Sequence, residues 1–251
     1  MKIDDDIQLV LSGAMGFDLS DAFDCNVFAI RAGQRWMLFD AGAGRDPRGL
    51  GAAFAASGLT PGAISHLFLT HAHADHSGAA AEVCDRFDPM VVAGAATARI
   101  VTAGDEAALH LPRARDAGVY PADYRYRACR VDRTMADGDT IATGDVAGDV
   151  TVTLLQTPGH SADHVSYLVD LPGRRLLVSG DALFFGGKVA IQDIPDCNIG
   201  DVCASVRRLA GLDAVDVLLP GHLGFSMADG GRHARAALGY VERFQCPPSI
   251  I

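Results

Sequence analysis

The stretch Thr70-His71-Ala72-His73-Ala74-Asp75-His76-Ser77-Gly78 places three imidazoles and one carboxylate within six consecutive positions, 71–76. The apolar run before it, Ile64–Leu69, predicts a buried strand. The run after it, Gly78–Cys84, predicts a helix with Ser77 as its N-cap. The stretch is therefore expected at a strand-to-helix turn at the edge of a core.

The spacing of these side chains suits metal binding. His71 and His73 are two residues apart, so in an extended turn both rings can point the same way, while Asp75 and His76 follow as the chain bends. One segment can thus serve two adjacent ions, and imidazole and carboxylate are ligands for zinc, iron or manganese. The alternative is a surface turn that happens to be rich in histidine. Against it, five of the nine histidines fall at motif positions.

The pattern His71-Ala-His73-Ala-Asp75-His76 resembles the HxHxDH signature of the metallo-β-lactamase-fold metallohydrolase superfamily. Three further motifs match the family in the same order, and the complete set is far more specific than HxHxDH alone. They are Thr157-Pro158-Gly159-His160-Ser161, Ser179-Gly180-Asp181-Ala182 and Leu219-Pro220-Gly221-His222. The resemblance runs from about Asn26 to the C-terminus and is strongest to the lactonase and glyoxalase II-like branch.

The resemblance implies an α/β fold, an αβ/βα four-layer sandwich in which two mixed sheets lie face to face with helices outside. It also implies a single domain over residues 1–251. Periodicity alone predicts only a mixed α/β class, because strands followed by helices occur twice and each ligand comes at a strand end. The predicted strands are Ile7–Ser12, Asn26–Arg31, Arg35–Asp40, Ile64–Leu69, Met90–Ala93, Val150–Thr157, His164–Asp170, Arg174–Ser179 and Ala214–Leu219. The predicted helices are Leu50–Ser57, a run to about Phe87, Ala95–Val101, Ile199–Ala210 and Gly231–Phe244.

Ligand roles also follow from the resemblance. It assigns the first metal to His71, His73 and His160, and the second to Asp75, His76 and His222, with Asp181 bridging the two. Two divalent ions are expected, zinc first, with iron or manganese as alternatives. A hydroxide held between the ions is the implied nucleophile. Asp75 and Asp181 are the candidate catalytic groups that pass a proton to the leaving group.

Several positions outside the ligand set have two interpretations. Asp40 either orients a metal-bound histidine or caps the turn that follows it. His164 either supports the metal site or is structural, and His66, His110 and His233 are interpreted as ordinary residues. The segment 102–133 has no clean period and is predicted to be an irregular insertion that forms part of the substrate mouth. The candidate substrate-binding residues are Tyr124, Tyr126, Phe184, Phe185 and Lys188, and for the aromatic ones the alternative is packing against the body of the protein.

Within the family the motifs favour a hydrolase of small lactones, esters or thioesters. Some β-lactamases carry Cys and Arg where this chain has Asp181 and His76. Many lactonases place Tyr where this chain has Phe184. Only about 29 residues follow His222, so the glutathione-binding helical domain of glyoxalase II-like enzymes is not expected. The alternatives are a mononuclear iron persulfide dioxygenase and a non-catalytic metal-binding member, and retention of every ligand disfavours the latter.

Composition limits the partners. A formal charge of −10 without a basic stripe argues against nucleic acid and anionic membranes. No signal pattern or membrane-length apolar run is present. The six cysteines are scattered without a CxxC pair, which favours a cytoplasmic chain with reduced thiols. Cys25, Cys84 and Cys203 lie in apolar patterns typical of a core. The expected partner is a small carbonyl ester substrate, with a homodimer as a possible assembly.

Overall fold

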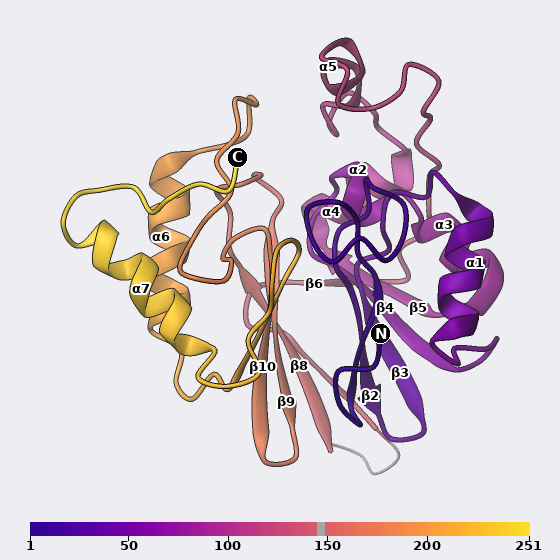
Figure 1. Ribbon diagram of the computed structural model, residues 1–251, viewed down its shortest axis with the longest axis horizontal. Coiled ribbons are helices and arrows are strands. Elements are labelled where there is room, and N and C mark those ends of the chain that lie inside the picture. The colour runs from indigo at the N-terminus through magenta and orange to yellow at the C-terminus, as the bar shows by residue number, and fades with distance from the viewer. Residues whose placement is uncertain (145–148) are drawn as a thin grey trace. The chain divides into compact units, whose positions relative to one another are not determined.

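The computed structural model describes residues 1–144 and 149–251. Two compact units make up the chain, Met1–Thr134 and Met135–Ile251, which Figure 1 shows in indigo to magenta and in orange to yellow. Each unit combines a mixed sheet with helices. The predicted α/β class with two mixed sheets is therefore confirmed.

The first unit is built on a six-stranded sheet in the order β1-β2-β3-β4-β5-β6. Strands β1 to β3 are antiparallel, and β3, β4 and β5 are parallel. The β2–β3 hairpin turns at Gly33, whose φ of +65° suits a residue without a side chain. The strands are β1 (Ile7–Leu11), β2 (Val27–Ala32), β3 (Arg35–Phe39), β4 (Ile64–Leu69), β5 (Met90–Gly94) and β6 (Arg133–Met135).

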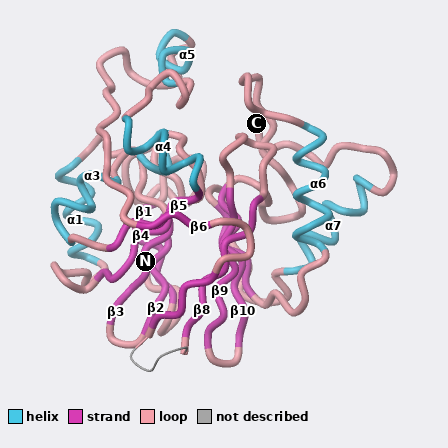
Figure 2. The backbone as a smooth tube through the Cα atoms, turned by 180° about the vertical axis from the view of Figure 1, so that it is seen from behind, coloured by secondary structure: helices cyan, strands magenta, loops and turns pink. Residues whose placement is uncertain are grey.

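Helices of the first unit follow its parallel strands. They are α1 (Pro47–Ala56), α2 (Ala74–Ser77), α3 (Ala80–Phe87), α4 (Ala95–Ala103) and α5 (Leu111–Asp116). Helices α1 and α3 lie side by side in both views (Figures 1 and 2). The Phe54 and Phe87 rings join them, with centroids 4.8 Å apart. One buried apolar cluster fills the space between these helices and the sheet.

The second unit repeats this plan with the strand order β11-β10-β9-β8-β7. Strands β7 to β10 are antiparallel, and β11 runs parallel to β10. Helices α6 and α7 lie together beside this sheet in both views (Figures 1 and 2). The elements are β7 (Thr140–Thr143), β8 (Val150–Gln156), β9 (Val165–Leu171), β10 (Arg174–Gly180), α6 (Ile199–Ala210), β11 (Val217–Pro220) and α7 (Gly231–Val241).

The observed elements match the predicted ones except in short segments. Strands β6 and β7 and helix α5 lie where no element was predicted. The predicted N-cap role of Ser77 is wrong. Ser77 belongs to α2, and its hydroxyl donates to the Ala72 carbonyl at 2.7 Å. Helix α3 begins after Ala79 without a side-chain cap.

Gly159, next to the predicted ligand His160, has a backbone conformation that a side chain would disturb. Its φ is +140°, and a Cβ atom there would lie 2.4 Å from the Val202 nitrogen at the start of α6. We expect Gly159→Ala to lower the free energy of unfolding by about 3 kcal/mol or more, because strain and a backbone clash add. Gly173→Ala is the control. It also has a positive φ, +80°, but has open space around it, and it should cost about 1 kcal/mol. If denaturant titrations show that both variants lose the same free energy of unfolding, the predicted clash at Gly159 is contradicted.

Among the described residues, no helix combines the length and the apolar character needed to cross a bilayer.

Candidate metal centre

The first unit holds four of the predicted ligands on one turn. Strand β4 ends at Leu69 and α2 begins at Ala74, so His71 and His73 lie in the loop while Asp75 and His76 lie on α2. The His71 ring centroid is 4.6 Å from that of His73 and 4.2 Å from that of His76. His71 and His76 are fully buried. Burial contradicts the alternative of a histidine-rich surface turn and confirms a strand-to-helix turn at the edge of a core.

Asp40, directly after β3, fixes the orientation of His76. Its Oδ2 lies 2.8 Å from His76 Nδ1, and its Oδ1 accepts the Thr70 backbone N–H at 2.8 Å. Because a carboxylate only accepts, the proton sits on Nδ1, and Nε2 presents its lone pair. That Nε2 lies 3.4 Å from Asp75 Oδ2. Of the two interpretations of Asp40, this geometry supports the orienting role.

Thr70 extends the same support to His71, a role that the sequence analysis missed. Its Oγ1 lies 2.9 Å from Asp40 Oδ2 and 3.0 Å from His71 Nδ1. The hydroxyl donates to the carboxylate, so it accepts from His71 Nδ1–H, which leaves Nε2 of His71 as a metal donor. One buried carboxylate therefore sets the tautomer of two histidines. The only sequence signal is the position of Thr70 directly before the motif.

The second unit brings the other three predicted ligands together around Asp181. These residues follow the ends of β8, β10 and β11. Asp181 Oδ2 lies 3.5 Å from His160 Nε2 and 3.5 Å from His222 Nε2. All three side chains are buried. His160 Nδ1 donates to the Ala190 carbonyl at 3.4 Å, so its Nε2 also presents a lone pair.

His164 holds the backbone of Asp181. The Asp181 N–H donates to His164 Nε2 at 2.9 Å, so the ring proton is on Nδ1 and donates to Thr157 Oγ1 at 3.0 Å. Thr157 in turn contacts Ser166 Oγ at 2.9 Å, and Ser166 donates to the Ser179 carbonyl at 3.2 Å. This buried chain of hydrogen bonds connects β8, β9 and β10 just below the ligands, as the supporting interpretation of His164 requires.

His164→Ala should therefore weaken metal binding as well as the fold. Loss of the acceptor leaves a buried N–H without a partner, which costs about 1–3 kcal/mol. It also frees Asp181, so metal affinity should fall about 10-fold to 100-fold. The measurements are a denaturant titration and a competitive chelator titration.

His233→Ala is the matched control. His233 is also buried and accepts a backbone N–H, from Gly186 at 2.9 Å, but lies outside the ligand set. The His233→Ala variant should have a lower free energy of unfolding than wild type but the same metal affinity. Equal metal affinity in His164→Ala and wild type would show that His164 is only structural.

The predicted substrate residues lie in different surroundings. The Tyr124 hydroxyl donates to the Ala43 carbonyl at 2.6 Å, and Tyr126 shares a 2.8 Å hydrogen bond with Ser77 Oγ, so both phenols bind the body of the first unit. Phe184 is buried, 6.3 Å from the His222 ring. Phe185 is exposed beside His233 at 4.6 Å, and Lys188 is exposed. Their contact with substrate stays a prediction.

Tyr120, in the segment 102–133, belongs to an aromatic cluster of the first unit. Its ring packs between Phe23 at 5.3 Å and Tyr124 at 5.0 Å, and the Arg45 guanidinium lies 4.2 Å over Phe23. Burial raises the pKa of Tyr120 well above its usual value, and the negative charge of Asp75 raises it further. The phenol is therefore neutral and lies near Asp75. The sequence showed an aromatic cluster here but did not single out Tyr120.

Cys25 is buried close to His76 and Asp40. Burial raises the pKa of Cys25 to about 12, so the thiol keeps its proton near neutral pH. Its nearest possible ligand atoms belong to Asp40 and His76, which already bond each other. Cys25 and Cys84 are buried as predicted, and Cys203 is half-buried against the apolar cluster of the second unit.

The chemistry of the donor set fits divalent metal ions. Three histidines, His71, His76 and His160, have their distal nitrogens held as lone-pair donors by hydrogen bonds on the other side of the ring. Each unit also has a carboxylate, Asp75 beside His76 in the first and Asp181 beside His160 in the second, which can balance the charge of a cation. Zinc accepts such a mixture of nitrogen and oxygen ligands.

Comparisons with known proteins show the family of the chain. The family model of the metallo-β-lactamase superfamily matches residues 20–222. Hydroxyacylglutathione hydrolase of Acidiphilium cryptum is 29% identical over 74% of this chain and 63% of its own length. That of Rhizobium etli is 30% identical over 63% of this chain and 48% of its own length. The chain thus matches about half to two thirds of these relatives.

Solved structures show the same fold. BJP-1, a subclass B3 metallo-β-lactamase of Bradyrhizobium japonicum, has a TM-score of 0.70 at 23% identity, over 97% of this chain and 91% of its own. A metallo-β-lactamase of Cronobacter sakazakii has a TM-score of 0.69 at 19% identity, over 97% and 96%.

Fold and motifs together define a protein of the metallo-β-lactamase fold. The chain belongs to the metallo-β-lactamase superfamily.

Proposed function

We propose that the two ligand sets together hold two divalent metal ions, zinc first, and that the protein hydrolyses a small thioester, ester or lactone. On the family pattern His71, His73 and His160 serve one ion, Asp75, His76 and His222 serve the other, and Asp181 bridges them. The proposal rests on how close together the candidate ligands and their supports lie within each unit. Asp40 fixes His76 at 2.8 Å, and Asp181 lies 3.5 Å from both His160 and His222.

We assign different roles to the two carboxylates, Asp75 and Asp181. Two bound ions supply a water activated near neutral pH and a Lewis acid for the carbonyl. Asp75 is the better candidate to move the proton to the leaving group, because its side chain is 23% exposed whereas that of Asp181 is 5% exposed. Asp181 keeps its charge buried between two histidines, which suits a permanent ligand.

The relatives and the first unit support the proposed substrate class. Relatives named hydroxyacylglutathione hydrolase favour a thioester over a lactone. The neutral Tyr120 phenol near Asp75 offers a hydrogen-bond donor for a carbonyl or leaving-group oxygen. Phe23 beside it offers an apolar surface for an acyl chain, and Arg45 adds a positive charge.

The experiment is a hydrolysis panel with and without metal. It compares S-lactoylglutathione, the same acyl group on a small thiol, a γ-lactone, a phenyl ester and a chromogenic cephalosporin, on zinc-loaded and chelator-treated protein. We expect metal-dependent thioester cleavage that exceeds cephalosporin cleavage by at least about 100-fold in kcat/KM. Restoring zinc should restore the rate.

Two outcomes contradict the proposal. Oxygen consumption with a persulfide, by protein that holds one iron and hydrolyses nothing on the panel, would show the dioxygenase alternative. Metal-loaded protein without turnover of any kind would show a non-catalytic member.

Tyr120→Phe tests the substrate contact. Losing one hydrogen bond to substrate should raise KM or lower kcat/KM about 5-fold to 10-fold, with metal content unchanged. Tyr240→Phe, on α7 beside Arg243, is the matched control and should behave as wild type. Wild-type kinetics in Tyr120→Phe would remove Tyr120 from the substrate site.

A further inference from the structure

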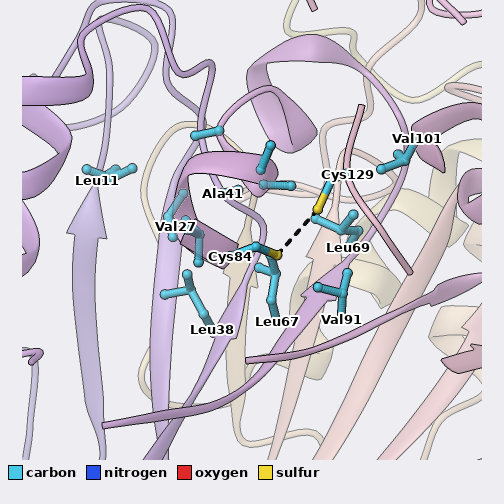
Figure 3. Close-up of a cluster of buried hydrophobic side chains, with 14 of the residues drawn as sticks. Leu11, Val27, Leu38, Ala41, Leu67, Leu69, Cys84, Val91, Val101 and Cys129 are labelled. Atoms are coloured by element: carbon cyan, nitrogen blue, oxygen red, sulfur yellow. Dashed lines mark hydrogen bonds between the residues drawn. The ribbon is translucent and has the colours of Figure 1, made fainter. Parts of the chain in front are cut away.

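Two cysteines distant in sequence meet inside the first unit. Cys84 on α3 and Cys129 in the segment before β6 have their Sγ atoms 3.4 Å apart. Figure 3 shows the two sulfurs pointing toward each other, with Leu67, Leu69, Val91 and Val101 around them. Both residues belong to the apolar cluster of this unit and are almost fully buried. A disulfide needs its sulfurs at about 2.0 Å, so the two Sγ atoms must approach by a little more than 1 Å for a bond to form.

The backbones that carry the two thiols are held in place. Cys84 lies in α3, and its carbonyl accepts the Asp88 N–H at 3.0 Å. The Cys129 N–H donates to the Val101 carbonyl near the end of α4 at 3.1 Å. Both anchors lie outside the side chains, so they persist when the sulfurs move. The pair is therefore preorganised for a bond between the sulfurs.

The two sulfurs differ in reactivity. A hydrogen bond from Cys129 lowers the pKa of the Cys84 thiol, and the nearby Arg130 guanidinium lowers it further. The same hydrogen bond together with burial raises the pKa of Cys129. A thiolate is the reactive form of cysteine, so Cys84 suits the attacking role and Cys129 the resolving role. The Cys129 S–H also donates to the Arg130 carbonyl at 3.3 Å, a contact that favours the protonated form of Cys129.

We propose that Cys84 and Cys129 form a reversible disulfide, a modification site for peroxides. The Cys84 thiolate attacks one peroxide oxygen, an S–O bond forms, the O–O bond breaks, and the leaving oxygen takes up a proton to become water or an alcohol. The Cys129 sulfur then attacks Cys84, an S–S bond forms, and the sulfenic oxygen leaves as water. The two sulfurs lose two electrons and the peroxide gains two. A dithiol reduces the disulfide to two thiols and is itself oxidised to a disulfide.

The bond would fix the segment 102–133 to the helix that follows the histidine turn. Residues 84 and 129 close a loop of 45 residues, and a cross-link of that length restricts the unfolded chain. Tyr126, three residues before Cys129, already contacts Ser77 on α2. Oxidation should therefore raise the melting temperature of the intact protein by roughly 5–10 °C.

The test is peptide mapping of the whole folded protein. Among the described residues Cys246 is the cysteine classed as exposed, so the experiment uses the Cys246→Ser background to avoid cross-links between molecules. Folded protein is treated with hydrogen peroxide, alkylated without reductant and digested with trypsin. We expect the peptide 49–86 linked to the tripeptide 128–130, a loss of 2 Da, and recovery of both free thiols with dithiothreitol.

Single serine variants separate the two roles. Cys129→Ser should leave a sulfenic acid on Cys84 that dimedone labels, and Cys84→Ser should show at least about 10-fold less label on Cys129. Cys203→Ser, half-buried in the second unit, is the matched control and should keep the 49–86/128–130 link.

Three results would overturn the proposal. One is the absence of the linked peptide after oxidation of the folded protein. Another is a link that forms only when the protein is oxidised in denaturant. A third is preferential dimedone labelling of Cys129, which would reverse the assigned roles.

Discussion

Asp40→Asn is expected to lower metal affinity and kcat/KM by roughly 100-fold or more, although the substituted residue is not one of the proposed ligands. The Asn oxygen should stay on the Thr70 N–H, so its NH2 group would face His76 Nδ1, where the carboxylate now lies 2.8 Å away. That contact requires a lone pair on Nδ1 and moves the proton to Nε2. His76 would then present N–H to the metal instead of a lone pair.

The backbone at Asp40 tolerates the change, so the effect can be measured on folded protein. Its φ of +61° lies in the region that Asn adopts readily. Asp24→Asn is the matched control. Asp24 is buried in the same unit and accepts the Ala43 N–H at 2.8 Å, and burial raises its pKa, so removing its charge should cost little. Isothermal titration with zinc and steady-state kinetics are the measurements. Wild-type zinc affinity in Asp40→Asn would refute the tautomer argument.

Asp181→Asn should separate metal binding from folding. The amide has no charge to balance two cations, so the metal-loaded protein should hold fewer ions and lose at least about 100-fold in kcat/KM. Asp181 is only 5% exposed, and a buried charge without its metal is costly. The metal-free variant should therefore be as stable as metal-free wild type or more stable.

Asp170→Asn is the control for this variant. Asp170 lies at the other end of β9 from His164 and pairs with Arg175 at 2.6 Å on the surface. Its loss should leave metal content and rate unchanged and alter stability by less than about 1 kcal/mol. Unchanged metal content and rate in Asp181→Asn would remove Asp181 from the ligand set. A large loss of metal-free stability would indicate a structural role instead.

Longer elements were predictable because local signals agree with the fold. The run Ile64–Leu69 carries apolar residues at four of its six positions and is buried at five of them, as suits a strand between two parallel neighbours. The hairpins at Gly33 and Gly173 carry turn residues with positive φ. Strands β6 and β7 were missed because three or four residues are too few to show alternation. Helix α5 was missed for the same reason, because it is only six residues long and has a proline in its first turn.

The site residues that could be predicted from the sequence are those that stand in the family motifs. His71, His73, Asp75 and His76 stand in one short run, and the other ligands follow in family order. The supports were harder to predict because they come from elsewhere in the chain: for Asp40 and His164 support was one of two interpretations, and the contacts of Thr70 were missed. Asp40 contacts His76 across 36 positions, Tyr126 contacts Ser77 across 49, and Cys84 contacts Cys129 across 45. Only the pairing of strands and loops in three dimensions brings such residues together.

The most direct test of the dinuclear proposal is the metal content of the chain measured together with turnover. Metal-free protein is titrated with zinc, bound zinc is measured by mass spectrometry of the element, and thioester hydrolysis is followed at each point. The proposal predicts saturation at two ions per chain, with most of the activity appearing as the second ion binds. Saturation at one ion with full activity, or two bound ions without hydrolysis of any substrate on the panel, would contradict it.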